Sequence, residues 1–126
     1  MKKRTWRDVF YSATEGVTAT FRTERNFRVH VLATLAIVAA AWFFQVSSLD
    51  WMLLTLAIGM VLGAELMNTA VEAAVDLVSP DWHPFAKKAK DAAAGAVLIA
   101  SATAAVIGVI VFWKPVADWL SLLLGH

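Results

Sequence analysis

The chain has no cysteine and almost no net charge. Without cysteine, the sequence carries no information about the redox state of its compartment. Eleven Lys and Arg residues against ten Asp and Glu residues give a formal net charge of +1, so the composition offers no reason to expect a nucleic acid partner. The chain also lacks an internal repeat and a low-complexity linker, and we expect one compact domain over residues 1–126.

Several common catalytic patterns are missing as well. The three histidines, His30, His83 and His126, do not have the spacing of a metal site. There is no Gly-x-x-x-x-Gly-Lys loop for nucleotide phosphates, and no arrangement suggests a Ser-His-Asp triad. The reactive groups that remain are carboxylates, an amide and lysines.

Hydrophobic residues are abundant, at 60% of the chain against 17% charged residues. They occur in long blocks, whereas a water-soluble helix would space them along one stripe. We therefore predict an all-α integral membrane protein with three transmembrane helices, over residues 29–44, 51–78 and 92–113. The third helix is expected to end at Lys114-Pro115, because proline makes continuation of a helix costly, and residues 116–126 are expected to lie along the membrane interface.

Residues 4–26 are predicted to form an N-terminal amphipathic helix on the membrane surface. A removable signal peptide is not expected, because this stretch has no short apolar core and no small-residue cleavage site. Glu24 falls on the apolar stripe of the helix, where it either pairs with Arg22, Arg25 or Arg28 at a frayed end or serves a function. The stripe consists of residues spaced by three or four: Trp6, Phe10, Ala13, Val17 and Phe21.

Lysine and arginine predict the orientation. Seven precede the first span, three precede the third, and none lies between the first two. By the positive-inside rule, the N-terminus and the loop over residues 79–90 face the cytoplasm, with the chain in an inner (plasma) membrane. The span ends on the outer side carry Trp42, Trp51 and Trp113, as expected at the headgroup level.

A polar stripe lies on the second long helix. Glu65, Glu72 and Asp76 fall within about 40° of one another, with Asn68 about 60° to one side. Glu65 lies roughly 21 Å from the outer boundary, inside the hydrocarbon, where an ionisable side chain costs about 2.5–3.5 kcal/mol and indicates a functional site. The alternative is a protonated Glu65 bonded to a neighbouring helix, with a solvated helix end beyond it.

Phosphoryl transfer fits these groups. It needs divalent cations at the nucleotide phosphates, a cationic side chain and a base for the attacking hydroxyl. Glu65 and Glu72 are about 10.5 Å apart along the helix, which favours different roles for them. Lys87 is placed to reach Asp91 at i+4, and lysines here are also expected from topology alone, although Lys90 differs because the chain enters the membrane directly after it.

Three segments resemble one family. ELMNTAVEAAVD at residues 65–76 resembles the signature of the prokaryotic diacylglycerol kinase family of membrane-embedded lipid kinases. TERNFRVH at 23–30 and HPFAKKAKDAAAGAV at 83–97 look like its Gram-positive branch, the undecaprenol kinases. The resemblance covers essentially residues 10–113.

This resemblance implies a homotrimer with composite sites between protomers, and it implies roles for individual residues. Glu65 would be the catalytic base, and Glu24 and Glu72 would hold Mg²⁺ together with ATP. Lys90 would meet the phosphates. The remaining implied members are Asn68, Asp76 and Asp91 in the polar site, Asp81 and His83 in the loop over the nucleotide, and Ser12 near the N-terminus. The family's diacylglycerol kinase branch differs from this sequence at His83-Pro84.

The predicted function is ATP- and magnesium-dependent phosphorylation of a membrane lipid alcohol at the cytoplasmic face, with undecaprenol preferred and diacylglycerol as the alternative. A small proton-coupled transporter that uses Glu65 is an alternative from another class, but its carboxylate should lie near the midplane between repeats. A structural subunit that packs through Gly59 and Gly63 is a third.

Overall fold

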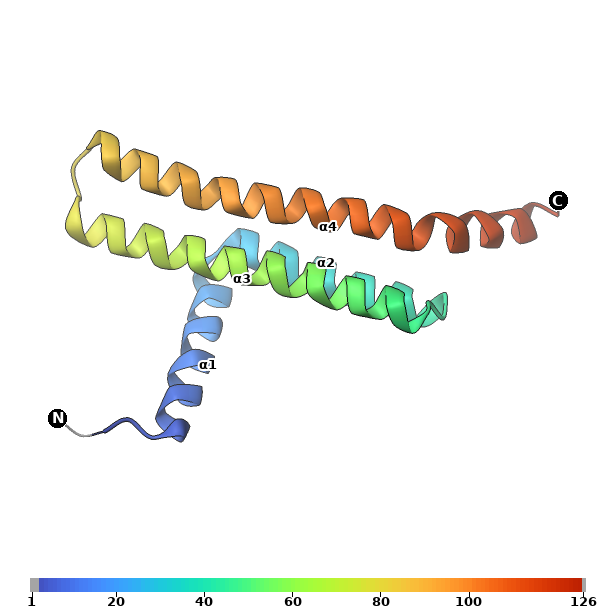
Figure 1. The fold of residues 1–126 in the computed structure, drawn as a ribbon, viewed down its shortest axis with the longest axis horizontal. Helices are drawn as coiled ribbons and strands as arrows, with labels where there is room; N and C mark the ends of the chain where they lie inside the picture. The colour runs from blue at the N-terminus through green and yellow to red at the C-terminus, as the bar shows by residue number, and fades with distance from the viewer. Residues whose placement is uncertain (1–2, 126) are drawn as a thin grey trace.

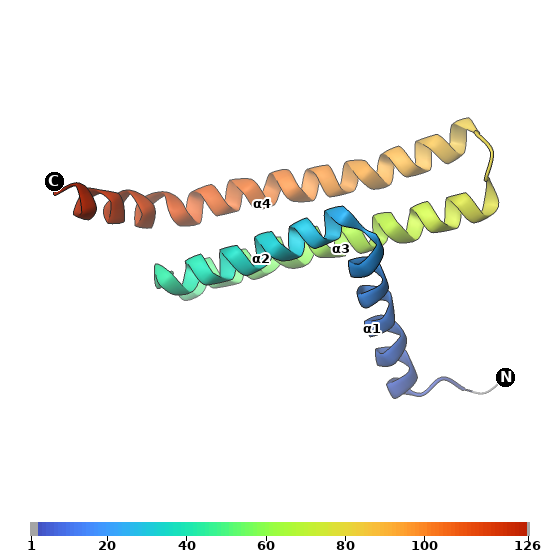
Figure 2. The ribbon, with the colours of Figure 1, turned by 180° about the vertical axis from the view of Figure 1, so that it is seen from behind.

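The computed structural model describes residues 3–125, and within this range all regular structure is helical. Figure 1 shows α2, α3 and α4 lying side by side, while α1 leaves them at a steep angle. The view from behind in Figure 2 shows the same arrangement. The all-α prediction is therefore confirmed, with four helices: α1 (Trp6–Thr23), α2 (Arg25–Phe43), α3 (Ser48–Val78) and α4 (Pro84–Leu124).

Three of these helices, α2, α3 and α4, are long and apolar enough to cross a membrane, as the sequence predicted. The chain exposes 9709 Å², whereas a water-soluble monomer of 13.7 kDa would expose about 6,600 Å². Large apolar side chains account for much of the exposed surface of all three helices. A lipid bilayer or further protein has to cover this surface, because soluble monomers rarely expose apolar patches of this extent to water.

Capping boxes fix the starts of two helices. Ser47 and Asp50 exchange side chain-to-backbone hydrogen bonds, so α3 begins at Ser48, three residues before the predicted start at Trp51. Thr5 and Asp8 form the same arrangement at the start of α1. The backbone N–H and the hydroxyl of Thr5 donate to the Asp8 carboxylate and hold its pKa below the ordinary value.

Glu24 separates α1 from α2. Its backbone is extended, with φ −100° and ψ 113°, and it caps the end of one helix and the start of the next. The predicted continuous helix to residue 26 is therefore wrong, and Glu24 does not lie on the apolar stripe. Arg28 donates to the carbonyls of Phe21 and Arg22 at 3.1 and 2.9 Å, which satisfies the last turn of α1.

The fourth helix is longer than predicted at both ends. It begins at Pro84, with the His83 side chain accepting the Phe85 N–H at 3.2 Å. It continues through Pro115 to Leu124, so the predicted helix end at Lys114-Pro115 is wrong. The missing proline N–H removes one backbone hydrogen bond, but Trp119 packs edge-on against Phe43 of α2 and against its C-cap residue Phe44, with ring centroids 6.0 and 6.4 Å apart. These contacts hold the turns after the proline in place.

The three long helices meet in a small core at the end where α2 turns into α3. Ala41 is completely buried there between Leu54 of α3 and Val111 of α4. An alanine at the centre lets the three helices approach closely. The core leaves α3 between its two neighbours, and the polar stripe lies on the half of α3 that leads away from this core.

We expect Ala41→Leu to destabilise the protomer by about 1–3 kcal/mol, because the added atoms have no space between Leu54 and Val111. The matched control is Ala39→Leu on the same helix, where the side chain is exposed. Thermal unfolding in detergent micelles measures the difference. Equal stability of the two variants would contradict the placement of Ala41.

Candidate active site

Glu65 is the buried carboxylate of the site. Only 4% of the residue is exposed, and its Oε1 lies 3.2 Å from Nε2 of His30 on α2. The sequence left open whether Glu65 bonds to a neighbouring helix, and it does so here. His30 was dismissed as a metal ligand, and its contact with Glu65 was not predicted. The available signal was that His30 is one of two polar residues that interrupt an otherwise apolar stretch.

This contact shows how α2 and α3 are aligned along their axes, with His30 beside Glu65. The two helices are antiparallel, because a short turn joins the end of α2 to the start of α3 (Figure 1). Glu24 precedes His30 by about 9 Å of helix, and Glu72 follows Glu65 by about 10.5 Å in the same direction. Glu24 and Glu72 therefore lie at nearly the same depth, both on the side of the α3–α4 loop.

Asn68 links the two depths of the polar stripe. Its Nδ2 donates to Oε1 of Glu72 at 3.4 Å, at the long end of the hydrogen-bond range. Its Oδ1 is buried and accepts no hydrogen bond from the residues that the structure describes. A buried amide oxygen without a partner is costly, so this atom is a candidate for a further polar contact beside Glu72.

A second group of predicted residues lines one cleft of about 660 Å³, where α3 ends and α4 begins. Lys90 forms an ion pair with Asp76 across the two helices, and Lys87 forms the predicted i+4 pair with Asp91. The loop between the helices closes the cleft. The structure thus gathers five of the predicted site residues around one space: Asp76, Asp81, His83, Lys90 and Asp91.

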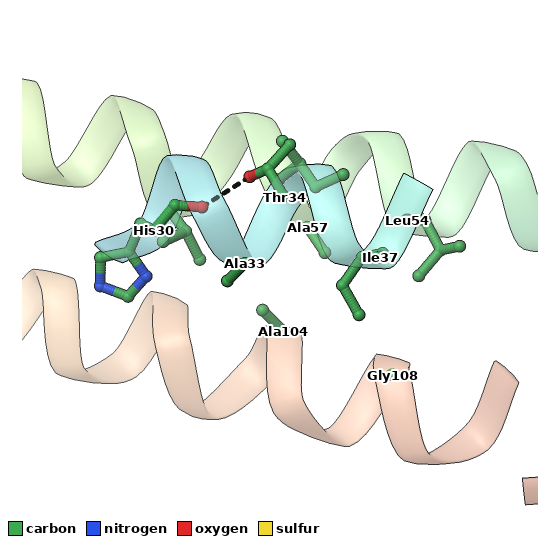
Figure 3. Close-up of a pocket in the computed structure, with 10 residues that line it drawn as sticks. His30, Ala33, Thr34, Ile37, Leu54, Ala57, Ala104 and Gly108 are labelled. Carbon is green, nitrogen blue, oxygen red and sulfur yellow. Dashed lines mark hydrogen bonds between the residues drawn. The ribbon is translucent and has the colours of Figure 1, made fainter. Parts of the chain in front are cut away.

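A second cleft lies within the helical bundle, between α2, α3 and α4. Figure 3 shows the His30 ring at one end of it, with Ala33 and Ile37 of α2 facing Ala104 and Gly108 of α4. This cleft of about 100 Å³ is lined almost entirely by apolar side chains. The one other polar side chain in its lining, Thr34, donates its hydroxyl to the His30 carbonyl at 2.8 Å. The sequence did not predict this cleft.

Ser12 stands apart from these groups. It lies on α1, where it accepts a hydrogen bond from the Arg4 guanidinium at 2.8 Å, and it does not line either cleft. Within one protomer the structure does not bring Ser12 to the other predicted residues.

The arrangement suits a reaction between a membrane-bound molecule and a water-soluble one. A buried carboxylate lies within one apolar span, and a charged cleft lies beyond it near the α3–α4 loop. Between them lie Glu72 and the free oxygen of Asn68.

Comparison with known proteins identifies the family. The model of the prokaryotic diacylglycerol kinase family matches residues 11–112. Undecaprenol kinase of Bacillus subtilis is 43% identical over 82% of this chain and 84% of that protein. Diacylglycerol kinase of Synechocystis is 42% identical over 79% of this chain and 57% of that protein, and diacylglycerol kinase of Escherichia coli K12 is 32% identical over 79% and 82%.

The resemblance first seen in three short segments therefore extends over most of the chain. They imply a bacterial membrane protein that uses ATP and a lipid substrate, and they give no support to the transporter or to the purely structural subunit. The chain belongs to the prokaryotic diacylglycerol kinase family and is a lipid kinase.

Proposed function

We propose that this lipid kinase phosphorylates undecaprenol with ATP and Mg²⁺, and that residues 1–126 form one kinase domain. The observation that carries the choice of lipid is the 43% identity to an undecaprenol kinase over most of both chains. Diacylglycerol is the second candidate, because the relatives from Synechocystis and Escherichia coli are diacylglycerol kinases. The core of the chemistry is the same for both lipids.

The proposed orientation places the N-terminus and the α3–α4 loop in the cytoplasm. Lysines and arginines cluster before the first and third spans, on the side where the positive-inside rule puts them. In this orientation α1 lies along the cytoplasmic surface with its apolar face towards the lipid. The charged cleft then opens towards cytoplasmic ATP.

Glu65 is the proposed catalytic base. Its carboxylate takes the proton of the lipid hydroxyl while the hydroxyl oxygen attacks the γ-phosphorus of ATP. The bond from that phosphorus to the β,γ-bridging oxygen breaks, and ADP leaves with the electron pair. The products are the lipid phosphate and ADP. Burial of Glu65 between helices keeps water from competing with the lipid for the phosphoryl group.

Glu24 and Glu72 are the proposed magnesium-binding residues. They lie at nearly the same depth, and the partnerless oxygen of Asn68 adds a third ligand of the type that Mg²⁺ prefers. In residues 3–125, no three acidic or histidine side chains gather as a metal site, and we propose that the ion takes its other ligands from phosphates and water. Magnesium bound with ATP offsets the charge of the phosphates.

Lys90 is the proposed phosphate contact. It lies in the charged cleft and is paired with Asp76, which holds its ammonium group near the helix ends. Asp81, His83 and Asp91 complete the nucleotide side of the site, and we propose that Ser12 joins it in the assembled protein.

The choice of lipid is tested by competition in mixed micelles. With undecaprenol and diacylglycerol present at equal mole fractions and radiolabelled ATP, we expect most of the label in undecaprenyl phosphate. A preference for diacylglycerol would assign this chain to the other branch. Label in neither lipid would contradict both candidates.

The carboxylates should fail differently when each is replaced by glutamine. Glu65→Gln removes the base, so single-turnover rates should fall by roughly 10²- to 10⁴-fold while MgATP still binds. Glu24→Gln and Glu72→Gln should weaken nucleotide binding, with partial rescue by added magnesium. Nucleotide affinity and turnover across a magnesium titration separate these outcomes.

Lysine variants in the same titration give the contrast. Lys90→Met should raise the ATP requirement at every magnesium level, because it removes a fixed charge at the phosphates. Lys88→Met is the matched control, since Lys88 is exposed and lies outside the cleft lining.

For the carboxylates, loss of MgATP binding in Glu65→Gln, together with normal binding in Glu72→Gln, would show that the assigned roles are reversed.

We propose that the chain assembles as a homotrimer, in which Gly59 and Gly63 of α3 form part of the interface. A Cβ atom built at either glycine meets no atom of its own protomer. We therefore expect Gly59→Leu and Gly63→Leu to leave the protomer helical and to weaken the assembly, with a smaller effect from alanine at the same positions. Molar mass in detergent, by light scattering, measures this. Unchanged trimers in both leucine variants would exclude this face as the interface.

A further inference from the structure

The buried carboxylate of Glu65 has a single side-chain partner. In the part of the chain that the structure describes, the one cationic or imidazole group within 4 Å of Glu65 is His30, at 3.2 Å. The ring reaches Glu65 from α2, and about a quarter of the His30 side chain remains exposed, against 6% of the Glu65 side chain. The function proposed above assigns nothing to His30.

The surroundings of this pair are apolar. Along α2, the next residues in the cleft are Ala33, Thr34 and Ile37, and the Thr34 hydroxyl is occupied by the His30 carbonyl (Figure 3). From α4, the cleft receives only Ala104 and Gly108. The imidazole of His30 is thus the polar end of an apolar cleft, and the Glu65 carboxylate is the ionisable group that it contacts.

A carboxylate that acts as a base needs one oxygen free and correctly directed. A glutamate side chain has three rotatable bonds, so a buried Glu65 without a partner would distribute its oxygens over several positions. Nε2 of His30 lies 3.2 Å from Oε1, and this contact restricts the positions that the carboxylate can take. It leaves Oε2 as the oxygen that is free for the substrate.

We infer that His30 is a positioning residue for the phosphoryl transfer: its Nε2–H holds Oε1 of Glu65 and directs Oε2 towards the hydroxyl of the lipid. This inference rests on the proposed role of Glu65 as the base. In the transfer step the hydroxyl proton moves to Oε2, the new bond forms between the lipid oxygen and the γ-phosphorus, and His30 keeps its proton throughout.

The experiment compares two variants at His30 and one at Thr69 under saturating lipid and MgATP. His30→Leu removes the donor, and we expect turnover to fall by about 10- to 100-fold, as for other residues that orient a catalytic group, with unchanged MgATP affinity. His30→Gln retains an N–H donor at a similar reach and should stay within about threefold of the parent. Thr69→Val is the matched control, because Thr69 donates only to the backbone carbonyl of Glu65, at 3.0 Å.

A double-mutant cycle separates positioning from packing. If His30 acts through the Glu65 carboxylate, His30→Leu should cost nothing further in the Glu65→Gln background. A role in packing α2 against α3 would cost the same in both backgrounds, and this result would overturn the inference. Should His30→Leu fail to fold in micelles, His30→Phe keeps a planar ring without the donor and serves the same comparison.

The remaining outcomes distinguish this inference from the proposed function. A slow Glu65→Gln enzyme together with a fully active His30→Leu enzyme would overturn only the role of His30. A His30→Gln enzyme as slow as His30→Leu would also overturn it, because the retained donor would then have no effect. Full turnover in Glu65→Gln would overturn the role of Glu65 and the inference together.

Discussion

The structure depends on burying one carboxylate inside a helical membrane bundle. An acidic side chain at membrane depth costs about 2.5–3.5 kcal/mol, and the chain meets this cost by placing His30 of α2 3.2 Å from Glu65 of α3. That contact places His30 of α2 beside Glu65 of α3 along the helix axes. Glu24 at the start of α2 and Glu72 on α3 come to the same depth as a result, and the charged cleft follows near the α3–α4 loop.

Depth also separates the two substrates. In the proposed function, a lipid alcohol approaches within the membrane while ATP and magnesium approach from water, so one site has to be open in two directions. The unbroken α3 carries polar groups at both depths, from buried Glu65 to exposed Asp76. Asn68 lies between them and bonds to Glu72. The single helix α3 therefore carries both the buried and the exposed polar groups of the candidate site.

The sequence predicted the features that depend on local pattern. Long apolar blocks indicated the three spans, and helical periodicity put Glu65, Glu72 and Asp76 on one face. It could not predict the features that depend on contacts between helices. Glu24 breaks the first helix where Arg28 satisfies the exposed carbonyls, and α4 passes through Pro115 where aromatic rings hold it. The partner of Glu65 was likewise invisible, because 35 residues separate it from His30 along the chain.

The proposed assembly has a physical reason in the glycine face that one protomer leaves uncovered. Gly59 and Gly63 lie on an exposed stretch of α3 with open space around them, although a membrane helix gains close packing from such residues only when another helix covers them. Ser12 on α1 lines neither cleft of its own protomer, and its hydroxyl accepts a hydrogen bond from Arg4. In the proposed trimer, neighbouring protomers cover the small-residue face and bring α1 to a site that its own helices do not complete.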